Sequence, residues 1–140
     1  MINRTITGTI DTFAASIQVP GDKSLSHRAL LFAGMAEGDS FVTGLAMGLD
    51  VKATAMALRA LGVDIGAGMG GEQVRSPGVH AWSQPSDPID CRNSGTTMRL
   101  LAGILSTSHV TAELIGDASL SARTMTRLLD PLESLGGMIS

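Results

Sequence analysis

The chain turns at Pro20-Gly21 and then reads Asp22-Lys23-Ser24-Leu25-Ser26-His27-Arg28-Ala29-Leu30-Leu31. The apolar residues that follow predict a helix over about 25–35, apolar almost all round, as a buried helix would be. The start of a helix carries free backbone N–H groups and the positive end of a dipole, and both attract an anion. Lys23 and Arg28 add positive charge there, while Ser24 and Ser26 add hydroxyl donors. The stretch therefore predicts a site for a small metabolite with two negative charges.

Two other interpretations use the same residues. Ser24 taken alone fits an ordinary helix N-cap, with Lys23 and Arg28 as solvated surface charges. A nucleotide-binding P-loop also ends in lysine and serine. It needs glycine directly before the lysine and again five residues earlier, where this chain has Asp22 and Ile17. The spacing excludes a P-loop.

The composition excludes several classes of protein. The chain has 140 residues, of which 44% are hydrophobic, and this suits a globular domain. Its net charge is −3 and no block of Lys or Arg occurs, which argues against a nucleic-acid partner. The single Cys91 cannot form an internal disulfide, and no cluster of Cys and His has metal-ligand spacing. No apolar run approaches membrane-spanning length. We therefore expect a cytoplasmic protein with no metal.

Periodicity predicts alternating strands and helices. Ile2, Ile6 and Ile10 are separated by even numbers of residues and would point to the same face of a strand. They indicate a first strand over about 4–10. The remaining expected strands cover 17–19, 40–45 and 109–115, with a hairpin from 63–65 and 72–75 and a strand beginning at 138–139. A second helix is expected between Asp50, which would cap it, and Gly62, which would end it. Two further helices are expected over about 94–105 and over 121–135. His27, His80 and His109 form no pattern, and we expect each at the surface or in a cap.

This order repeats once. Arg28 and Arg99 hold equivalent places in the first helix of each unit, and Gly62 and Gly136 end the second helix of each unit. Two copies of a unit of loop, helix, strand, helix and strand predict an α/β fold built by internal repetition.

Two later loops match the first in kind. Asn93-Ser94-Gly95-Thr96-Thr97 supplies donors at a helix start, and Gly95 allows a ligand to approach the backbone closely. Taken alone, this loop also fits an ordinary cap. The stretch from Gly116-Asp117 to Arg123 would open another helix, with Arg123 in its first turn. A cation gains nothing from the dipole there, and this suggests an anion partner.

The three loops together resemble the EPSP synthase family (3-phosphoshikimate 1-carboxyvinyltransferases). Residues 20–30 resemble the first signature of that family, residues 93–99 its second and residues 116–123 its third. The resemblance covers essentially the whole chain. It implies an enolpyruvyl transferase fold of repeated βαβαββ units, of which this chain would hold about two units of one domain. Residues 1–20 would form strands that pair with the second domain, and residues 21–140 would form part of the substrate-binding domain.

The resemblance also implies a reaction and roles for residues. The family moves the enolpyruvyl group of phosphoenolpyruvate to the 5-hydroxyl of shikimate 3-phosphate, in chorismate biosynthesis, without a cofactor. Lys23 would contact both substrates, and Ser24 and Arg28 would hold the shikimate moiety. Asn93, Gly95 and Thr96 would lie beside phosphoenolpyruvate, a position that glyphosate also takes, and Arg123 would bind its phosphate.

The chain departs from the family pattern in three ways. Arg92 stands where the family usually has Gly, and Thr124 where it usually has Pro. The chain is also about one third of the family's usual length, so we expect an N-terminal fragment that is inactive alone, with the missing part in a separate chain as one option. Alternatives are a non-catalytic anion-binding module, a decayed gene product, or the related transferase that acts on UDP-N-acetylglucosamine.

Overall fold

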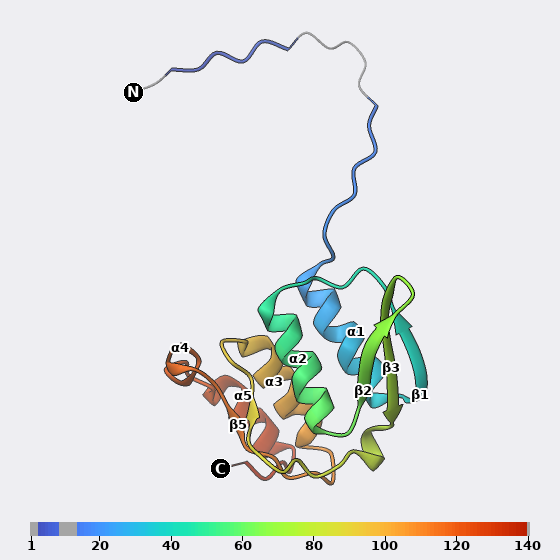
Figure 1. The fold of residues 1–140 in the computed structure, drawn as a ribbon. Coiled ribbons are helices and arrows are strands. Elements are labelled where there is room, and N and C mark those ends of the chain that lie inside the picture. Colours follow the sequence, from blue (N-terminus) through green and yellow to red (C-terminus); the bar gives the residue numbers. More distant parts are fainter. Residues whose placement is uncertain (1–2, 9–13, 140) are drawn as a thin grey trace.

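The computed structural model describes residues 3–8 and 14–139, and these form a mixed α/β structure (Figure 1). Its helices are α1 (Lys23–Met35), α2 (Leu49–Ala60), α3 (Gly95–Leu105), α4 (Ala118–Ser121) and α5 (Thr126–Ser134), with a 3-10 turn η1 (Val79–Ala81). Its strands are β1 (Glu37–Val42), β2 (Asp64–Gly68), β3 (Gly71–Pro77), β4 (Ile89–Asp90) and β5 (Leu114–Ile115).

The larger sheet is antiparallel, with the strand order β1-β3-β2. The predicted hairpin is confirmed as β2 and β3, which turn at Met69 and at Gly70, whose φ is +83°. The strand predicted over 40–45 begins and ends earlier, because its pairing with β3 runs from Glu37 opposite Pro77 to Val42 opposite Glu72. In the smaller sheet, β4 pairs in parallel with β5. In the sequence, β4 precedes α3 and β5 follows it.

Helices α1, α2 and α3 lie side by side and begin at the same end of the layer, with α2 in the middle (Figure 1). The expectation that α1 is buried all round is wrong. Leu30 and Leu31 face the core, whereas Leu25 and Phe32 are 67% and 66% exposed. The helix packs against α2 on one side and against β1 and β3 on another, so its remaining face stays open.

The core joins this helical layer to the sheet. It contains Leu58 and Leu61 of the α2 region, Val74 of β3 and the single tryptophan of the chain, Trp82, which is 2% exposed. The indole Nε1 of Trp82 donates a hydrogen bond of 2.9 Å to the carbonyl of Gly34, near the end of α1. Gly62 follows α2 with a φ of +89°, as the predicted helix end requires.

The two ends of the chain depart most from the predicted elements. Residues 3–8 and 14–20 form no strand, and their Ile6 and Ile17 are 95% and 82% exposed. Residues 9–10 of the first predicted strand lie outside the described residues. A strand needs a partner for its backbone groups, and in the described parts of the chain these segments have none.

The C-terminal third is also less regular than predicted. The strand expected over 109–115 reduces to β5, and the helix expected over 121–135 divides into α4 and α5. Between them the chain breaks from helix at Arg123 and Thr124. Residues 138 and 139 form no strand within the described region.

Candidate anion-binding site

Lys23, Ser24 and Arg28 share the exposed first turns of α1, as predicted. The Lys23 ammonium pairs with the carboxylate of Asp50, in the first turn of α2, and its side chain stays 56% exposed. Arg28 Nη1 donates to the carbonyl of Ser24 at 3.1 Å, which draws the guanidinium back toward the start of the helix. One hydroxyl and two cations therefore meet at one end of α1.

The cap of α1 differs from the expectation. Asp22, not Ser24, is the N-cap, and its side chain accepts from the Leu25 backbone N–H at 2.8 Å. Ser26 is buried, donates to the Asp22 carbonyl at 2.7 Å and accepts from the Ala46 N–H at 2.9 Å. Because a carboxylate already caps the helix, attraction of an anion here depends on the Lys23 and Arg28 side chains.

Gly21 allows the loop before α2 to cross the start of α1. A Cβ at this position would lie 1.9 Å from the carbonyl oxygen of Gly44 and 2.9 Å from the Ala46 nitrogen. Backbone atoms cannot move aside as a flexible side chain can, so residue 21 has no room for a side chain. This close approach holds the Lys23 turn against the entry to α2.

The second loop carries Gly95 at the first position of α3. Ser94 caps the helix, accepting from the Thr97 N–H at 3.2 Å, and Thr96 is half-buried beside it. A Cβ on Gly95 would lie 2.8 Å from Arg99 Nη1 and 3.2 Å from Arg123 Nη1. Two guanidinium groups therefore flank the bare backbone of Gly95, which suits an anion that approaches closely.

Asn93 connects the second loop to the third. Its Nδ2 donates to both carboxylate oxygens of Asp117, at 3.0 and 2.7 Å, and its Oδ1 accepts from Arg123 Nη2 at 2.7 Å. Arg123 follows the C-terminal end of α4, so its predicted place in the first turn of a helix is wrong. The side chain nevertheless reaches Gly95, and Asn93 orients it.

The Asp117 carboxylate is held in its charged form. The hydrogen bond from Asn93, then that from the Leu120 N–H, lowers the pKa of Asp117, and the Arg123 charge contributes in the same direction. Asp117 is also the N-cap of α4. It therefore fixes Asn93, and through Asn93 it fixes the Arg123 guanidinium.

Asp50 joins the first loop to the second. Its carboxylate pairs with Lys23, while its backbone carbonyl accepts from Thr97 Oγ1 at 3.2 Å. The structure thus brings together the predicted residues of all three loops along the N-terminal ends of α1, α2 and α3. In the sequence, Asp50 suggested only a helix cap, and Gly48 takes that place.

His27 is the residue whose environment differs most from the prediction. It is fully buried, and its Nδ1 lies 2.7 Å from Thr54 Oγ1 of α2. Burial, followed by the charge of Lys23 and opposed by that of Asp50, lowers the pKa of the imidazole. Thr54 lies three residues after Val51 and four before Leu58, which is the spacing of the core face of α2, and that spacing is the sequence signal for its position.

Arg92 occupies a backbone conformation that favours glycine. Its φ is +53°, and it is the only non-glycine with a positive φ among residues 3–8 and 14–139. The carbonyl of Arg92 accepts from the Asp117 N–H at 2.8 Å, so this turn links the second and third loops. The place where the family usually has Gly is therefore one where the backbone itself favours Gly.

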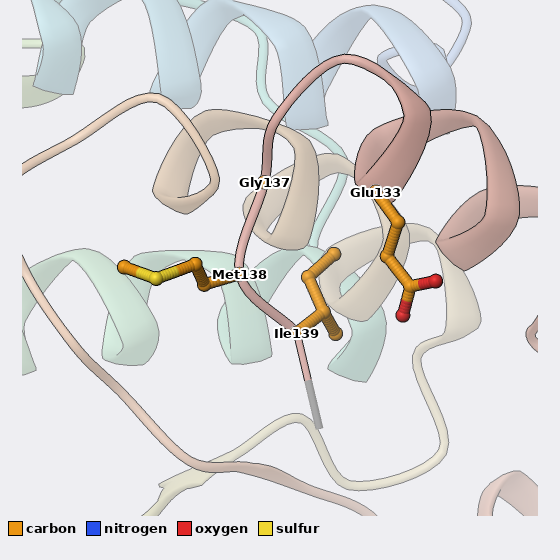
Figure 2. Close-up of a pocket in the computed structure, with 4 residues that line it drawn as sticks. All are labelled: Glu133, Gly137, Met138 and Ile139. Carbon is orange, nitrogen blue, oxygen red and sulfur yellow. The ribbon is translucent and has the colours of Figure 1, made fainter.

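Two hollows have linings that include none of these cations. A pocket of about 440 Å³ is lined by Glu133, Gly137, Met138 and Ile139, and its one charged side chain is a carboxylate (Figure 2). A second, of about 510 Å³, lies between α3 and α5 and is mostly apolar. Neither has the charge that an anionic ligand requires.

The described part of the chain has no group of three or more His, Cys, Asp or Glu placed to hold a metal ion. Of the helices that the structure describes, none combines the length and the apolar character needed to cross a membrane.

Fold and site together define an α/β protein with cations and hydroxyls on the loops at neighbouring helix starts, and with Arg99 and Arg123 beside the bare backbone of Gly95. A sequence model of EPSP synthase (3-phosphoshikimate 1-carboxyvinyltransferase) matches residues 8–140, and the chain belongs to this family. It is 46% identical to the 3-phosphoshikimate 1-carboxyvinyltransferase of Sphingopyxis alaskensis over 96% of its length, and 47% identical to that of Acidiphilium cryptum over 89%.

A solved structure gives the same result for the fold. The EPSP synthase from Acinetobacter baumannii superposes with a TM-score of 0.82 and 42% identity, over 87% of this chain. The chain spans 32% and 28% of the two curated relatives, and 28% of the A. baumannii protein.

Proposed function

We propose that this chain provides the phosphoenolpyruvate-binding and shikimate 3-phosphate-binding loops of an EPSP synthase. In that reaction the 5-hydroxyl of shikimate 3-phosphate takes up the enolpyruvyl group, and inorganic phosphate leaves. Two anionic substrates have to be held together, and cations offset both their repulsion and the charge of the leaving phosphate.

Each predicted residue has a role in this proposal. Lys23 would leave Asp50 and contact both substrates, while Ser24 and Arg28 would hold the shikimate moiety. Arg123, braced by Asn93, would take the phosphate of phosphoenolpyruvate over the backbone of Gly95 and Thr96. The placement of Arg99 and Arg123 around Gly95 is the observation that supports the proposal most, because it sets two cations beside a backbone position that has no side chain.

The rest of the synthase would complete the site. We propose that residues 21–140 form two repeats of the substrate-binding domain and that residues 1–20 pair with strands of the other domain. The remaining sequence, in the same polypeptide or as a separate chain, would supply the groups that move protons. The 140-residue chain alone would then bind substrates without turnover. A single buried free thiol, Cys91, is in keeping with a reducing cytoplasm.

The test is a chimera in which residues 8–140 replace the matching segment of the Sphingopyxis alaskensis relative, assayed for phosphate release. Lys23→Ala removes a charge-assisted contact to each substrate, each worth about 1.5–3 kcal/mol, and we expect a fall in kcat/KM of at least tenfold. Lys52→Ala is the matched control, because Lys52 is the other lysine of the chain and lies exposed on α2.

Near-normal turnover of the Lys23→Ala chimera would contradict the assignment. A chimera that folds and binds both substrates but releases no phosphate would favour a non-catalytic anion-binding module instead.

A further inference from the structure

Four buried polar side chains form one hydrogen-bonded chain through the helical layer. His27 Nδ1 lies 2.7 Å from Thr54 Oγ1, Thr54 Oγ1 lies 2.7 Å from Thr97 Oγ1, and Thr97 Oγ1 lies 2.8 Å from Ser94 Oγ. None of the four residues is more than 1% exposed. This hydrogen-bonded chain crosses from α1 through α2 to the start of α3.

Both ends of this hydrogen-bonded chain reach the candidate site. His27 lies one helical turn after Lys23 on α1, and Ser94 directly precedes Gly95. A branch leads from Thr97 Oγ1 to the carbonyl of Asp50 at 3.2 Å, and the carboxylate of Asp50 holds Lys23. The hydrogen-bonded chain therefore connects the Lys23 loop to the Gly95 loop inside the protein.

Ser94 is polar because it caps α3, but packing alone does not require polar groups at His27, Thr54 and Thr97. Apolar side chains of similar size would fill the same space without the cost of removing hydroxyls and an imidazole from water. Apolar faces also tolerate small shifts of one helix against another, whereas hydrogen bonds of 2.7–2.8 Å fix a single arrangement. The gain from this chain is therefore in the geometry that it imposes.

We propose that this hydrogen-bonded chain sets the distance between the Lys23 loop and the Gly95 loop, with Thr54 as its central positioning residue. The inference deepens the proposed function and rests on it for its consequence in catalysis. Thr54 is fully buried, and its hydroxyl hydrogen-bonds to His27 and Thr97.

The proton arrangement of the chain follows from the acceptors. Each hydroxyl has one proton, and the carbonyl of Asp50 can only accept. With the hydroxyl proton of Thr97 donated to the Asp50 carbonyl, Thr54 donates to Thr97, and His27 donates from Nδ1 to Thr54. His27 Nε2, which has no hydrogen-bond partner among the described residues, is then the unprotonated nitrogen.

The test compares Thr54→Val with Thr54→Ser by NMR of the 140-residue chain without substrate. Valine keeps the shape but removes the hydroxyl, so the amide resonances of Ser94 and Gly95 should shift, and serine should restore them. Thr43→Val, at an exposed position, is the matched control. In the chimera, Thr54→Val should raise the KM for phosphoenolpyruvate about 3- to 10-fold, and Thr54→Ser should recover it.

Unchanged Ser94 and Gly95 resonances in a folded Thr54→Val chain would overturn the proposal. If that variant does not fold, the ¹⁵N shifts of His27 in the unmodified chain decide: one fixed neutral tautomer supports the proposal, and a rapidly exchanging mixture of tautomers, which shows that Nδ1 has no fixed partner, overturns it. These spectra need no substrate, so they remain decisive even if the Lys23→Ala chimera contradicts the proposed function.

Discussion

Gly95 and Arg92 illustrate how a single backbone position can determine the site. Gly95 is small so that two guanidinium groups can approach the start of α3, and Arg92 holds a left-handed turn although it has a side chain. Glycine removes an obstacle in the first case and would remove backbone strain in the second. The two positions therefore lead to opposite predictions for stability and binding.

Gly95→Ala should weaken binding while leaving the fold intact. The new methyl group would meet the ends of two flexible side chains, Arg99 and Arg123, so these would move rather than the backbone. Alanine is also the better helix former, by up to about 1 kcal/mol. In the chimera we expect glyphosate inhibition to weaken more than phosphoenolpyruvate binding, measured by inhibition and saturation curves. Equal inhibition of the parent chimera and the variant would argue against this loop as the binding position.

Arg92→Gly should stabilise the protein. A left-handed residue with a Cβ costs about 1–2 kcal/mol, and the added freedom of glycine in the unfolded chain returns part of this, so the net gain should be about 0.5–1 kcal/mol. The measurement is urea unfolding. Arg92→Ala is the control, because it loses the contact of the guanidinium with Met56 but keeps the strain. The idea fails if glycine proves less stable than alanine.

At the scale of elements, the sequence predicted what local rules determine. The helix starts near Lys23, Asp50 and Ser94 and the hairpin of β2 and β3 are found within a few residues of their predicted places, because caps, glycines and periodicity act locally. The predictions that fail depend on partners distant in sequence. Examples are the strand over 17–19, which has no paired strand, and the surface position of His27, which α2 covers.

The same distinction applies to the site. Lys23, Arg28 and Gly95 could be chosen from motifs, since charge and spacing are visible in the sequence. Asp50 and Thr54 could not, because their roles come from the packing of α2 against both neighbouring helices.

The packing of α1 on α2 should make stability depend on pH. Burial, then the Lys23 charge, lowers the pKa of His27 below its ordinary value of 6.5, and Arg28 acts in the same direction while Asp50 opposes it. The unfolded chain therefore binds more protons than the native chain as pH falls below about 6.5, and the free energy of unfolding should decrease from pH 7 to pH 5. Above that range the stability from neutral His27 is fully present.

His27→Asn should remove this part of the slope, because the other two histidines, His80 and His109, remain in both proteins. Urea unfolding at pH 7, 6 and 5 measures it. If the free energy of unfolding falls equally with pH in the two proteins, the pKa of His27 is the same in the native and unfolded states.

At the scale of the whole molecule, one core joins the helical layer to the three-stranded sheet, while the C-terminal third has short elements and a mostly apolar hollow between α3 and α5. Cys91 belongs to the buried part, fully covered between β4 and the second loop. Its accessibility therefore reports on the integrity of the region that connects the two parts.

Cys91 should resist thiol reagents until the chain opens. Burial, and then the charge of Asp90, raises the pKa of this thiol from 9.0 to about 11, so the reactive thiolate is scarce at pH 8. We expect labelling by an aromatic disulfide reagent to be slow in buffer and complete in strong denaturant, and to accelerate in step with unfolding. Labelling in buffer at the rate of a small free thiol would show that the Cys91 sulfur is not buried.

The indole of Trp82 offers a built-in optical reporter. Its emission should be blue-shifted in the native protein and move to longer wavelength when the sheet separates from α1. The ring is anchored to Gly34, eleven residues along α1 from Lys23, a span of about 17 Å at the rise of an α-helix. The fluorescence of Trp82 should therefore change when the protein unfolds but not when an anion binds near Lys23. Unfolding can then be followed in an unlabelled sample without interference from binding.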